Sequence, residues 1–307
     1  MPRYEIPVIV ARIAALLGEP AGEPVPLEGG ITNRNFRVTF GSRDYVVRLP
    51  GKDTDLLGID REAECNANDC AAELGVAPPV AVMLREPPVI VTRFVEGRTM
   101  EPSDLRKPAV VAQVAAALRA VHGSDAELST DFNSFRVVER YAETASERGA
   151  QIQAGYRDAL ERAHAVEAAL DGDEHAPVPC HNDLLAANFL HDGTHLQIVD
   201  WEYAGMGDRY FDLANFAVNN SLDADGETAL LEAYFGDPPD SRQSACLHLM
   251  RFMSDFREAM WGVVQSAVSE LDFDFSAYAR EHFHRLERTA ADPQFEIWLE
   301  QARGAPA

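Results

Sequence analysis

Three polar residues in the second half of the chain have the types and the spacing that phosphoryl transfer requires. Asp183 lies in a predicted loop, Asn188 comes five residues later, and Asp200 follows a short predicted hairpin. The reaction needs an oxygen that orients or deprotonates the attacking hydroxyl group, and oxygen ligands for a Mg²⁺ ion that bridges the phosphates. We therefore predict that Asp183 acts on the substrate hydroxyl group and that Asn188 and Asp200 bind the metal.

The hairpin between Asn188 and Asp200 is expected to bring these two side chains together. Asp192-Gly193 is typical of a turn between two short apolar runs, 189–191 and 196–199. Asp and Asn also occur as simple caps and turn residues, which bind no ligand. The complete spacing favours the catalytic interpretation over that alternative.

Residues suited to a nucleotide lie near the start of the chain. Two alternating runs, 35–40 and 44–49, predict a β-hairpin, and the segment Gly29-Gly30-Ile31-Thr32-Asn33 precedes it. A tight backbone at Gly30 would let the N–H groups of Thr32 and Asn33 bind phosphate oxygens. Two glycines before a strand are more often only a turn, so this stretch is weak evidence by itself.

The elements that must position these residues change character along the chain. An amphipathic helix is predicted from Val8 to Leu17, a second one begins at the N-cap Asp60, and a buried strand covers 89–95. After Gly97 the pattern becomes helical, with 188–201 as the one β interruption. Helices are predicted at 108–121, in the region 136–170, at 226–235 and at 241–270.

The catalytic segment can be compared with known families. His181-Asn182-Asp183, with four residues before Asn188 and then Asp200-Trp201-Glu202-Tyr203, resembles the choline/ethanolamine kinase family, including its bacterial LicA-type members. It resembles the aminoglycoside phosphotransferases more broadly. The resemblance covers about 27–285 and implies an α+β, two-lobed protein-kinase-like fold that uses ATP and Mg²⁺. A small β-rich N-lobe, 1–96, would bind ATP, and a large, mainly helical C-lobe, 97–307, would hold the catalytic loop and the substrate-binding helices.

The same resemblance assigns further residues to the nucleotide. The family shows a similar Gly-Gly-x-Ser/Thr-Asn stretch, which strengthens the assignment of Gly30, Thr32 and Asn33. Choline kinases also resemble this chain in having an Arg where Arg48 lies, on the third strand. A guanidinium there suits phosphate and pairs with a helix carboxylate, for which Glu62 is the first choice and Glu64 the second. The resemblance also implies that backbone groups around Arg93 and Val95 bind the adenine edge.

On the acceptor side, the resemblance points to aromatic residues and a carboxylate. Glu202 and Tyr203 follow the metal-ligand turn, while Trp261 and Phe275 match aromatic residues of the choline kinase cage. Aromatic faces and carboxylates attract ammonium groups. One family tryptophan is replaced by Glu258, which is interpreted either as part of the pocket or as a solvated surface residue. Trp261 and Phe275 could also be ordinary core residues.

A further segment, 207–215, resembles the family's Phe-Asp-Ile-Gly-Asn stretch. Within it, Asp212 is expected to brace the catalytic loop by accepting hydrogen bonds from backbone N–H groups. That role is structural rather than catalytic.

Composition limits the partners. Against 27 Lys and Arg residues the chain has 50 Asp and Glu residues, giving a net charge of −23, which argues against nucleic acid or an anionic membrane surface as a partner. No apolar run of about 18 residues and no signal-peptide pattern is seen, so we expect a cytoplasmic protein that does not insert into membranes. The four cysteines, Cys65, Cys70, Cys180 and Cys246, lack CxxC spacing and are expected to be buried rather than to form zinc sites or disulfides. The oligomeric state is left open.

Choline is therefore the first acceptor to consider, with ethanolamine or another small amino alcohol as rivals. A second hypothesis is a related kinase that acts on an aminoglycoside, thiamine or a sugar. A third is a catalytically silent nucleotide-binding protein, against which the presence of Asp183, Asn188 and Asp200 argues.

Overall fold

The computed structural model describes most of the chain in two compact units. The described residues are 5–27, 33–51, 54–170 and 172–303. Unit 1 consists of Met1–Met100 with Ala187–Glu202, and unit 2 consists of Glu101–Ala186 with Tyr203–Ala307. The segment Ala187–Glu202 therefore packs with the N-terminal residues, although it lies within the predicted C-lobe. The functions given to the two predicted lobes stay predictions.

Unit 1 is built on a five-stranded antiparallel sheet with the order β1-β2-β3-β5-β4. Its strands are β1 (Val25–Leu27), β2 (Arg34–Phe40), β3 (Arg43–Leu49), β4 (Val80–Arg85) and β5 (Pro88–Arg93). Gly41, in the left-handed region at φ 60°, makes the tight turn between β2 and β3. The predicted hairpin is thus confirmed, while β5 ends two residues before the predicted strand does.

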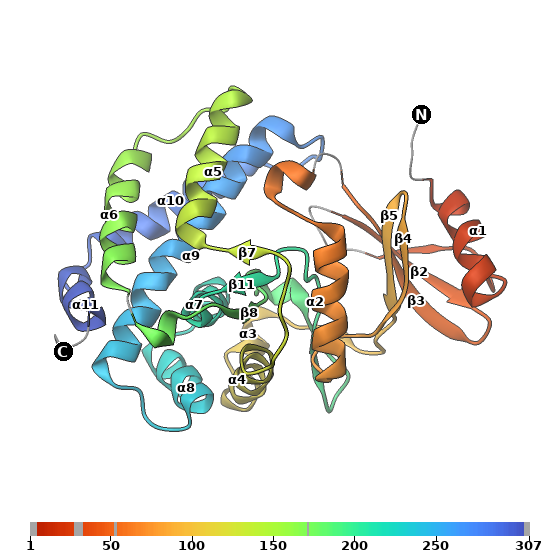
Figure 1. Cartoon of the computed structure of the whole chain (residues 1–307), viewed down its shortest axis with the longest axis horizontal. Helices are drawn as coiled ribbons and strands as arrows, with labels where there is room; N and C mark the ends of the chain where they lie inside the picture. The colour runs from red at the N-terminus through yellow and green to blue at the C-terminus, as the bar shows by residue number, and fades with distance from the viewer. Residues whose placement is uncertain (1–4, 28–32, 52–53, 171, 304–307) are drawn as a thin grey trace. The chain divides into compact units, whose positions relative to one another are not determined.

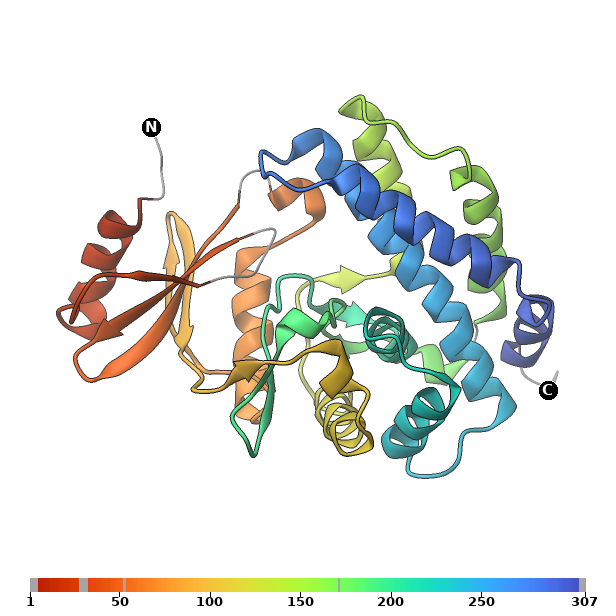
Figure 2. The ribbon, with the colours of Figure 1, turned by 180° about the vertical axis from the view of Figure 1, so that it is seen from behind.

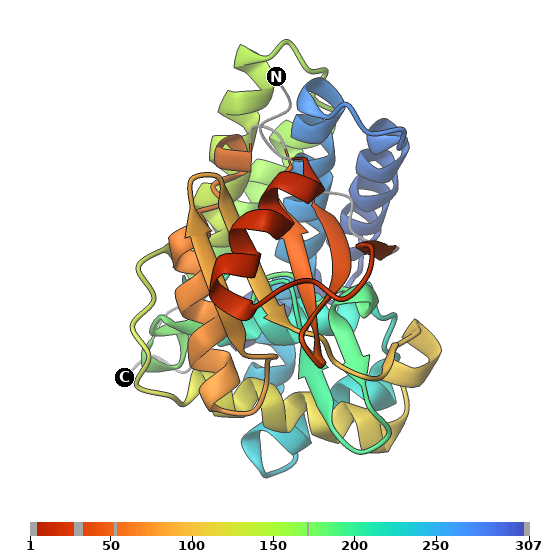
Figure 3. The same cartoon turned by 90° about the vertical axis from the view of Figure 1, so that its right-hand side faces the viewer.

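Helix α1 (Ile6–Leu17) covers one face of this sheet, as Figure 3 shows. Its apolar stripe, Ile9, Val10 and Ile13, is buried with side chains from β2 and β3 such as Val38 and Val47. This packing follows from the period of the apolar residues, which places them on one side of the helix.

Helix α2 (Arg61–Glu73) lies on the other side of the sheet from α1 (Figure 1). The Asp60 carboxylate accepts hydrogen bonds from the N–H groups of Glu62 and Ala63, each at 2.9 Å, so the predicted N-cap is confirmed. A short 3₁₀ helix, η1 (Thr54–Leu57), precedes it. A small second sheet completes unit 1, with the order β10-β9-β6, from β6 (Arg98–Thr99), β9 (Phe189–His191) and β10 (Leu196–Ile198).

Unit 2 is mainly helical, and its longest helix, α9 (Ser241–Val268), is central to it. Its helices are α3 (Pro102–Leu105), α4 (Pro108–His122), α5 (Ser134–Glu147), α6 (Tyr156–Ala169), α7 (Arg209–Asn219), α8 (Ala224–Phe235), α9, α10 (Phe275–Ala290) and α11 (Phe295–Ala302). Helix α9 is in contact with α5, α7, α10 and α11, and Figure 2 shows α10 running along it. Among the described residues, no helix has both the length and the apolar character needed to cross a membrane.

Unit 2 also contains a small three-stranded sheet, so the prediction of a single β interruption after Gly97 is wrong. The sheet has the order β7-β11-β8, from β7 (Asp131–Phe132), β8 (Val178–Cys180) and β11 (Gly205–Gly207). A Cβ atom on Gly205 would lie 2.9 Å from the Thr130 carbonyl oxygen, so the close approach of β11 to β7 requires glycine. Strands of two or three residues are too short to show the alternation of apolar and polar residues that predicts a strand. They form here because segments that are distant in the chain lie side by side.

Candidate active site

The β9–β10 hairpin brings the backbones of the two predicted metal ligands together. Asn188 ends the 3₁₀ helix η3 (Ala186–Asn188), and its carbonyl oxygen accepts the Val199 N–H at 2.9 Å, directly before Asp200. Asp200 has φ 70°, a left-handed conformation that is uncommon outside glycine. Such strain persists only where the surrounding structure holds it, and it is frequent at functional sites.

Arg48 lies in a buried ionic network of unit 1. Its Nη1 atom is 2.6 Å from Asp200 Oδ1 and 2.7 Å from Glu64 Oε1. The prediction that Glu62 pairs with Arg48 is therefore wrong. Glu62 is 60% exposed and pairs with Arg85, because residues two apart on a helix point about 200° apart, so only one of the two glutamates faces the sheet. The second choice, Glu64, is the partner.

The same network contains Asn33 and Glu202. Glu202 Oε2 accepts hydrogen bonds from Asn33 Nδ2 at 2.8 Å and from Arg61 Nη1 at 3.0 Å, and Arg61 Nη2 donates to Asn33 Oδ1 at 3.1 Å. Arg61 Nη1 also lies 2.6 Å from Glu64 Oε2. These contacts join Glu202, predicted for the acceptor, to Asn33, predicted for ATP, and to Arg61, which was not predicted. Gly30 and Thr32, the other predicted phosphate-binding residues, lie outside the described residues.

The network carries more negative than positive charge. Its ionisable members in the described part of unit 1 are Arg48, Arg61, Glu64, Asp200 and Glu202. Burial and the adjacent Asp200 carboxylate raise the pKa of Glu202 to about 7. A proton on Glu202 or a cation bound at Asp200 would neutralise the excess negative charge. An excess of carboxylates over arginines is expected where a protein binds a metal ion.

The predicted adenine-binding segment begins at Arg93, the last residue of β5. The Arg93 N–H donates to the Pro79 carbonyl oxygen at 3.0 Å, so this donor is already used within unit 1. The Arg93 guanidinium lies 5.2 Å from the centre of the Tyr45 ring. Val95 is half-buried just after the strand. Contact of Arg93 and Val95 with adenine stays a prediction.

In unit 2, Asp212 on α7 braces the predicted catalytic loop. Its two carboxylate oxygens accept the backbone N–H groups of His181 at 2.8 Å and Asn182 at 2.6 Å. Burial opposes the charge of Asp212, but His122, whose Nε2 is 3.1 Å away, outweighs it and lowers the pKa of Asp212. The predicted bracing role is confirmed.

Asp183, next in this loop, lies beside a buried arginine that is not among the residues predicted from the sequence. Arg257 Nη1 is 3.4 Å from Asp183 Oδ1 and 2.6 Å from Glu258 Oε1, and the guanidinium lies 4.2 Å from the centre of the Tyr203 ring. Arg257 is 1% exposed, and its Nε and Nη2 atoms have no hydrogen-bond partner in the described structure. The sequence shows that Arg257 and Glu258 are neighbours in the chain, but it gives no sign that Asp183 lies beside them.

The predicted aromatic residues do lie together. Trp261 Nε1 donates to the Tyr203 hydroxyl oxygen at 2.8 Å, and the Trp261 ring is 5.7 Å from Phe275 at an angle of 68°. Tyr278, which was not predicted, lies 5.5 Å from Trp261 at 70° and donates to Glu258 Oε2 at 2.7 Å. We call these four rings and Glu258 the aromatic cluster.

Burial decides between the two interpretations of Glu258. The residue is 2% exposed, so it is not a solvated surface residue. Burial would raise its pKa, but Arg257 and then His282 outweigh that effect and lower it, so Glu258 is ionised at neutral pH. Trp261 and Phe275 are buried as well, so burial alone does not separate a cage from an ordinary core.

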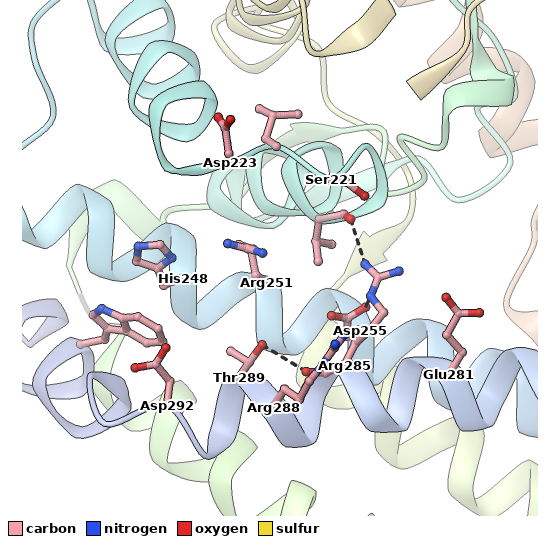
Figure 4. Close-up of a pocket in the computed structure, with 13 residues that line it drawn as sticks. Ser221, Asp223, His248, Arg251, Asp255, Glu281, Arg285, Arg288, Thr289 and Asp292 are labelled. Atoms are coloured by element: carbon pink, nitrogen blue, oxygen red, sulfur yellow. Dashed lines mark hydrogen bonds and ion pairs between the residues drawn. The ribbon is translucent and has the colours of Figure 1, made fainter. Parts of the chain in front are cut away.

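A pocket of about 700 Å³ in unit 2 is lined by residues from the α7–α8 connection and from α9, α10 and α11 (Figure 4). Arg285 Nε lies 2.9 Å from Asp255, and Arg251 pairs with Glu227. His248 stacks on Trp298 at 4.5 Å, and burial, with Arg251 nearby, lowers the pKa of His248 to about 4. None of the residues predicted for phosphoryl transfer lines this pocket.

Comparison with known proteins identifies similar sequences and structures. Residues 23–245 match the phosphotransferase enzyme family. The crystal structure of a choline/ethanolamine kinase family protein from Mesorhizobium loti is 32% identical, with a TM-score of 0.84, over 97% of this chain and 98% of that one. Choline kinase LicA from Streptococcus pneumoniae is 24% identical, with a TM-score of 0.79, over 93% and 98%. A LicA protein of Haemophilus influenzae is 29% identical over 67% of this chain, and the aligned part spans 61% of that protein.

The two structural similarities extend over almost the whole chain. They confirm the predicted α+β, protein-kinase-like fold with its sheet-rich N-terminal part. They also confirm the expectation of a phosphotransferase.

Proposed function

We propose that this chain, which belongs to the choline/ethanolamine kinase family and to the wider phosphotransferase enzyme family, transfers the γ-phosphoryl group of ATP to the hydroxyl group of a small amino alcohol. One observation carries this proposal beyond family membership. Each unit holds a partly or fully buried group of ionic residues in which carboxylates outnumber arginines by one, and the surroundings of the two groups differ.

The group in unit 1 suits a metal–nucleotide complex. Arg48, which is 15% exposed in its side chain, is suited to bind phosphate oxygens, as its fork of N–H donors favours. Asn188 and Asp200 offer the oxygen ligands that Mg²⁺ prefers, and the excess negative charge beside Asp200 fits a divalent cation. The bound ion would neutralise charge on the phosphates. Asn33 and Arg61 fix Glu202 and keep this polar wall in place.

The group in unit 2 suits an organic cation that carries a hydroxyl group. Asp183 orients the acceptor hydroxyl group and accepts its proton as the oxygen–phosphorus bond forms. Arg257 lies beside Asp183, with Nη1 at 3.4 Å from Oδ1, and its positive charge attracts the catalytic carboxylate. Glu258 and the aromatic rings supply the charge and the π-faces that attract an ammonium group.

Choline remains the first candidate, and two observations favour ethanolamine as the alternative. A quaternary ammonium group has no N–H donor and depends on open aromatic faces, but the face of Tyr203 is covered by Arg257 at 4.2 Å. A primary ammonium group can instead donate hydrogen bonds to the ionised Glu258. The two acceptors therefore test different parts of the aromatic cluster.

A coupled assay of Mg²⁺-dependent ADP formation tests the proposal, with choline, ethanolamine, thiamine and kanamycin as acceptors. We expect turnover with choline or ethanolamine. In Asp183→Asn the turnover rate should fall roughly 10³-fold, while the variant still binds ATP. Asp158→Asn, on the exposed side of α6, is the matched control. Turnover only with thiamine or kanamycin would overturn the acceptor class. Absence of turnover with every acceptor, together with intact ATP binding, would favour a silent nucleotide-binding protein.

A further inference from the structure

A cluster of ionisable side chains that the proposed reaction does not use lies where three segments of unit 2 meet. Glu174 and His175 belong to the 3₁₀ helix η2 (Asp173–His175), and Cys246 lies on α9. One carboxylate oxygen of Glu174, a ring nitrogen of His175 and the Cys246 sulfur all lie within 4.8 Å of one another. We call these three residues the thiol cluster.

Asp208, the N-cap of α7, fixes the orientation of the histidine in this cluster. The Asp208 Oδ2 atom is 2.6 Å from Nδ1 of His175, so Nδ1 carries the proton and donates it. The other ring nitrogen, Nε2, is then left with its lone pair facing Cys246 Sγ at 3.7 Å and Glu174 Oε1 at 3.8 Å. A carboxylate behind a histidine, with other ligands in front of it, is the arrangement that proteins use to present imidazole to a metal.

A second, independent observation concerns a buried hydroxyl group beside the cluster. The Tyr210 side chain is 0% exposed, and its hydroxyl group has no hydrogen-bond partner in the described structure. Its ring centre lies 5.4 Å from that of His175, so the Tyr210 ring packs against the cluster. A buried hydroxyl group without a partner is costly, and an ion or an ordered water at the cluster would satisfy it.

The carboxylate of the cluster already has one cation beside it. Glu174 Oε1 forms an ion pair with Arg242 Nη2 at 2.6 Å. A metal ion would share this oxygen with Arg242, and its binding would favour the thiolate form of Cys246.

We propose that Cys246, His175 and Glu174 bind one Zn²⁺ ion, with Asp208 as the carboxylate that orients His175. The ligand set of one sulfur, one imidazole nitrogen and one carboxylate oxygen is typical of zinc. A tetrahedral ion with ordinary Zn–S and Zn–N bonds places sulfur and nitrogen about 3.6 Å apart, which the 3.7 Å between Cys246 Sγ and His175 Nε2 matches. Binding releases the thiol proton to solvent, and a water that meets the Tyr210 hydroxyl group completes the four ligands.

The position of this ion indicates what it does. η2 directly precedes β8, after which the chain enters the catalytic loop, and Cys246 belongs to the central helix α9. Zinc would therefore tie the segment that leads to Asp183 to the core of unit 2. Because the site would stabilise the fold rather than act on substrate, this proposal does not depend on the identity of the acceptor. It departs from the sequence-based expectation that Cys246 is only a small buried residue.

The test uses the full chain without a histidine tag, stripped of metal by a chelator and titrated with Zn²⁺ against a chromophoric chelator. Excess Mg²⁺ is present throughout, so that the proposed nucleotide metal site is not counted. We expect about one equivalent of tightly bound Zn²⁺ and a rise in the unfolding temperature. Glu174→Gln, His175→Gln and Cys246→Ser should each weaken binding at least tenfold.

Matched controls separate this site from binding elsewhere. Cys70→Ser and His164→Gln change a partly exposed cysteine and an exposed histidine outside the cluster, and they should bind Zn²⁺ as the unaltered chain does. Replacement of Zn²⁺ by Co²⁺ should give a thiolate-to-cobalt absorption band that disappears in Cys246→Ser. Equal Zn²⁺ affinity in Glu174→Gln and the unaltered chain, or a cobalt complex without the thiolate band, would overturn the proposal. Neither result would bear on phosphoryl transfer.

Discussion

The two ionic groups of this protein have the same imbalance of charge but opposite surroundings. In unit 1, Arg48 and Arg61 meet three carboxylates within a polar network, and Asp200 keeps 18% of its side chain exposed. In unit 2, Arg257 meets Asp183 and Glu258 among aromatic rings and is almost completely buried. Water and ions can reach the charged groups of the first site. In the second site, the surrounding aromatic side chains exclude water.

This difference indicates how one chain can hold two unlike ligands. A hydrated metal and its phosphates are bound through oxygen ligands and cations in a polar setting. An ammonium group is recognised best where aromatic faces exclude water and a carboxylate supplies the charge. We therefore expect changes in unit 1 to act on nucleotide binding and on the pH dependence of stability, and changes in unit 2 to act on acceptor binding and to cause the largest loss of stability.

The largest effect is expected from Arg257→Met, which breaks the buried group of unit 2. The variant removes the guanidinium that Asp183 and Glu258 share in a buried setting, so the free energy of unfolding should fall by about 3–5 kcal/mol. Urea unfolding measures this loss. Arg148→Met, in the exposed segment after α5, should change it by less than about 0.5 kcal/mol. An Arg257 variant as stable as the unaltered chain would show that the guanidinium is not needed by either carboxylate.

Glu202→Gln tests the polar group of unit 1 through pH. The folded pKa of about 7 exceeds the unfolded value, so the unaltered chain loses stability as pH rises from about 4.5 to about 7. In the variant, the free energy of unfolding should lack the part of this decline that Glu202 causes. The change with pH in the free energy of unfolding should therefore differ between the two chains by up to about 3 kcal/mol. Thermal unfolding followed across this pH range measures it. Parallel profiles would mean that Glu202 is ionised throughout and that the network is already balanced.

Glu64→Gln and Glu62→Gln form a matched pair on α2. Glu64 is 3% exposed in its side chain and holds Arg48 and Arg61, so its change should cost about 2 kcal/mol of stability and raise the KM for ATP about tenfold. Glu62 is exposed and pairs only with Arg85 among the described residues, so its change should leave both quantities nearly unaltered. Steady-state kinetics with varied ATP distinguishes the two. A larger effect of Glu62→Gln would restore the pairing that the sequence suggested first.

The smallest effect is expected from Trp261→Phe, which keeps an aromatic ring but removes the Nε1 donor to Tyr203. The KM for the acceptor should rise roughly threefold to tenfold, since one buried hydrogen bond contributes about 1 kcal/mol, and the KM for ATP should not change. Trp298→Phe, at the remote pocket, is the control. Equal changes in both KM values would identify Trp261 as an ordinary core residue.

The features that the sequence predicted correctly depend on short stretches of chain. The cap at Asp60, the β2–β3 hairpin and the turn at Asp192-Gly193 are local, and spacing alone fixes them. The bracing role of Asp212 came from the resemblance to a family rather than from a pattern. Local signals and known motifs thus define the frame of the site well.

The features that were missed depend on contacts between distant segments. The sequence favoured Glu62 over Glu64 as the partner of Arg48, and only the packing of α2 on the sheet shows that Glu64 faces it. Arg257 is recognisable only once Asp183, 74 positions away in the chain, lies beside it. The thiol cluster likewise joins η2 to α9 across 71 positions. Contacts between segments so far apart in the chain leave no regular spacing in the sequence that would reveal them.

Calorimetric binding to Asp200→Asn and Glu258→Gln tests most directly whether the two groups divide their ligands. One titration uses a non-hydrolysable ATP analogue with Mg²⁺, and the other uses choline and ethanolamine with that analogue's complex at saturation. We predict that Asp200→Asn lowers the affinity for the analogue–Mg²⁺ complex at least tenfold. Glu258→Gln should lower only the affinity for the acceptor, and more for ethanolamine than for choline. Loss of nucleotide affinity in Glu258→Gln, with unaltered affinity in Asp200→Asn, would contradict the division of ligands between the two groups.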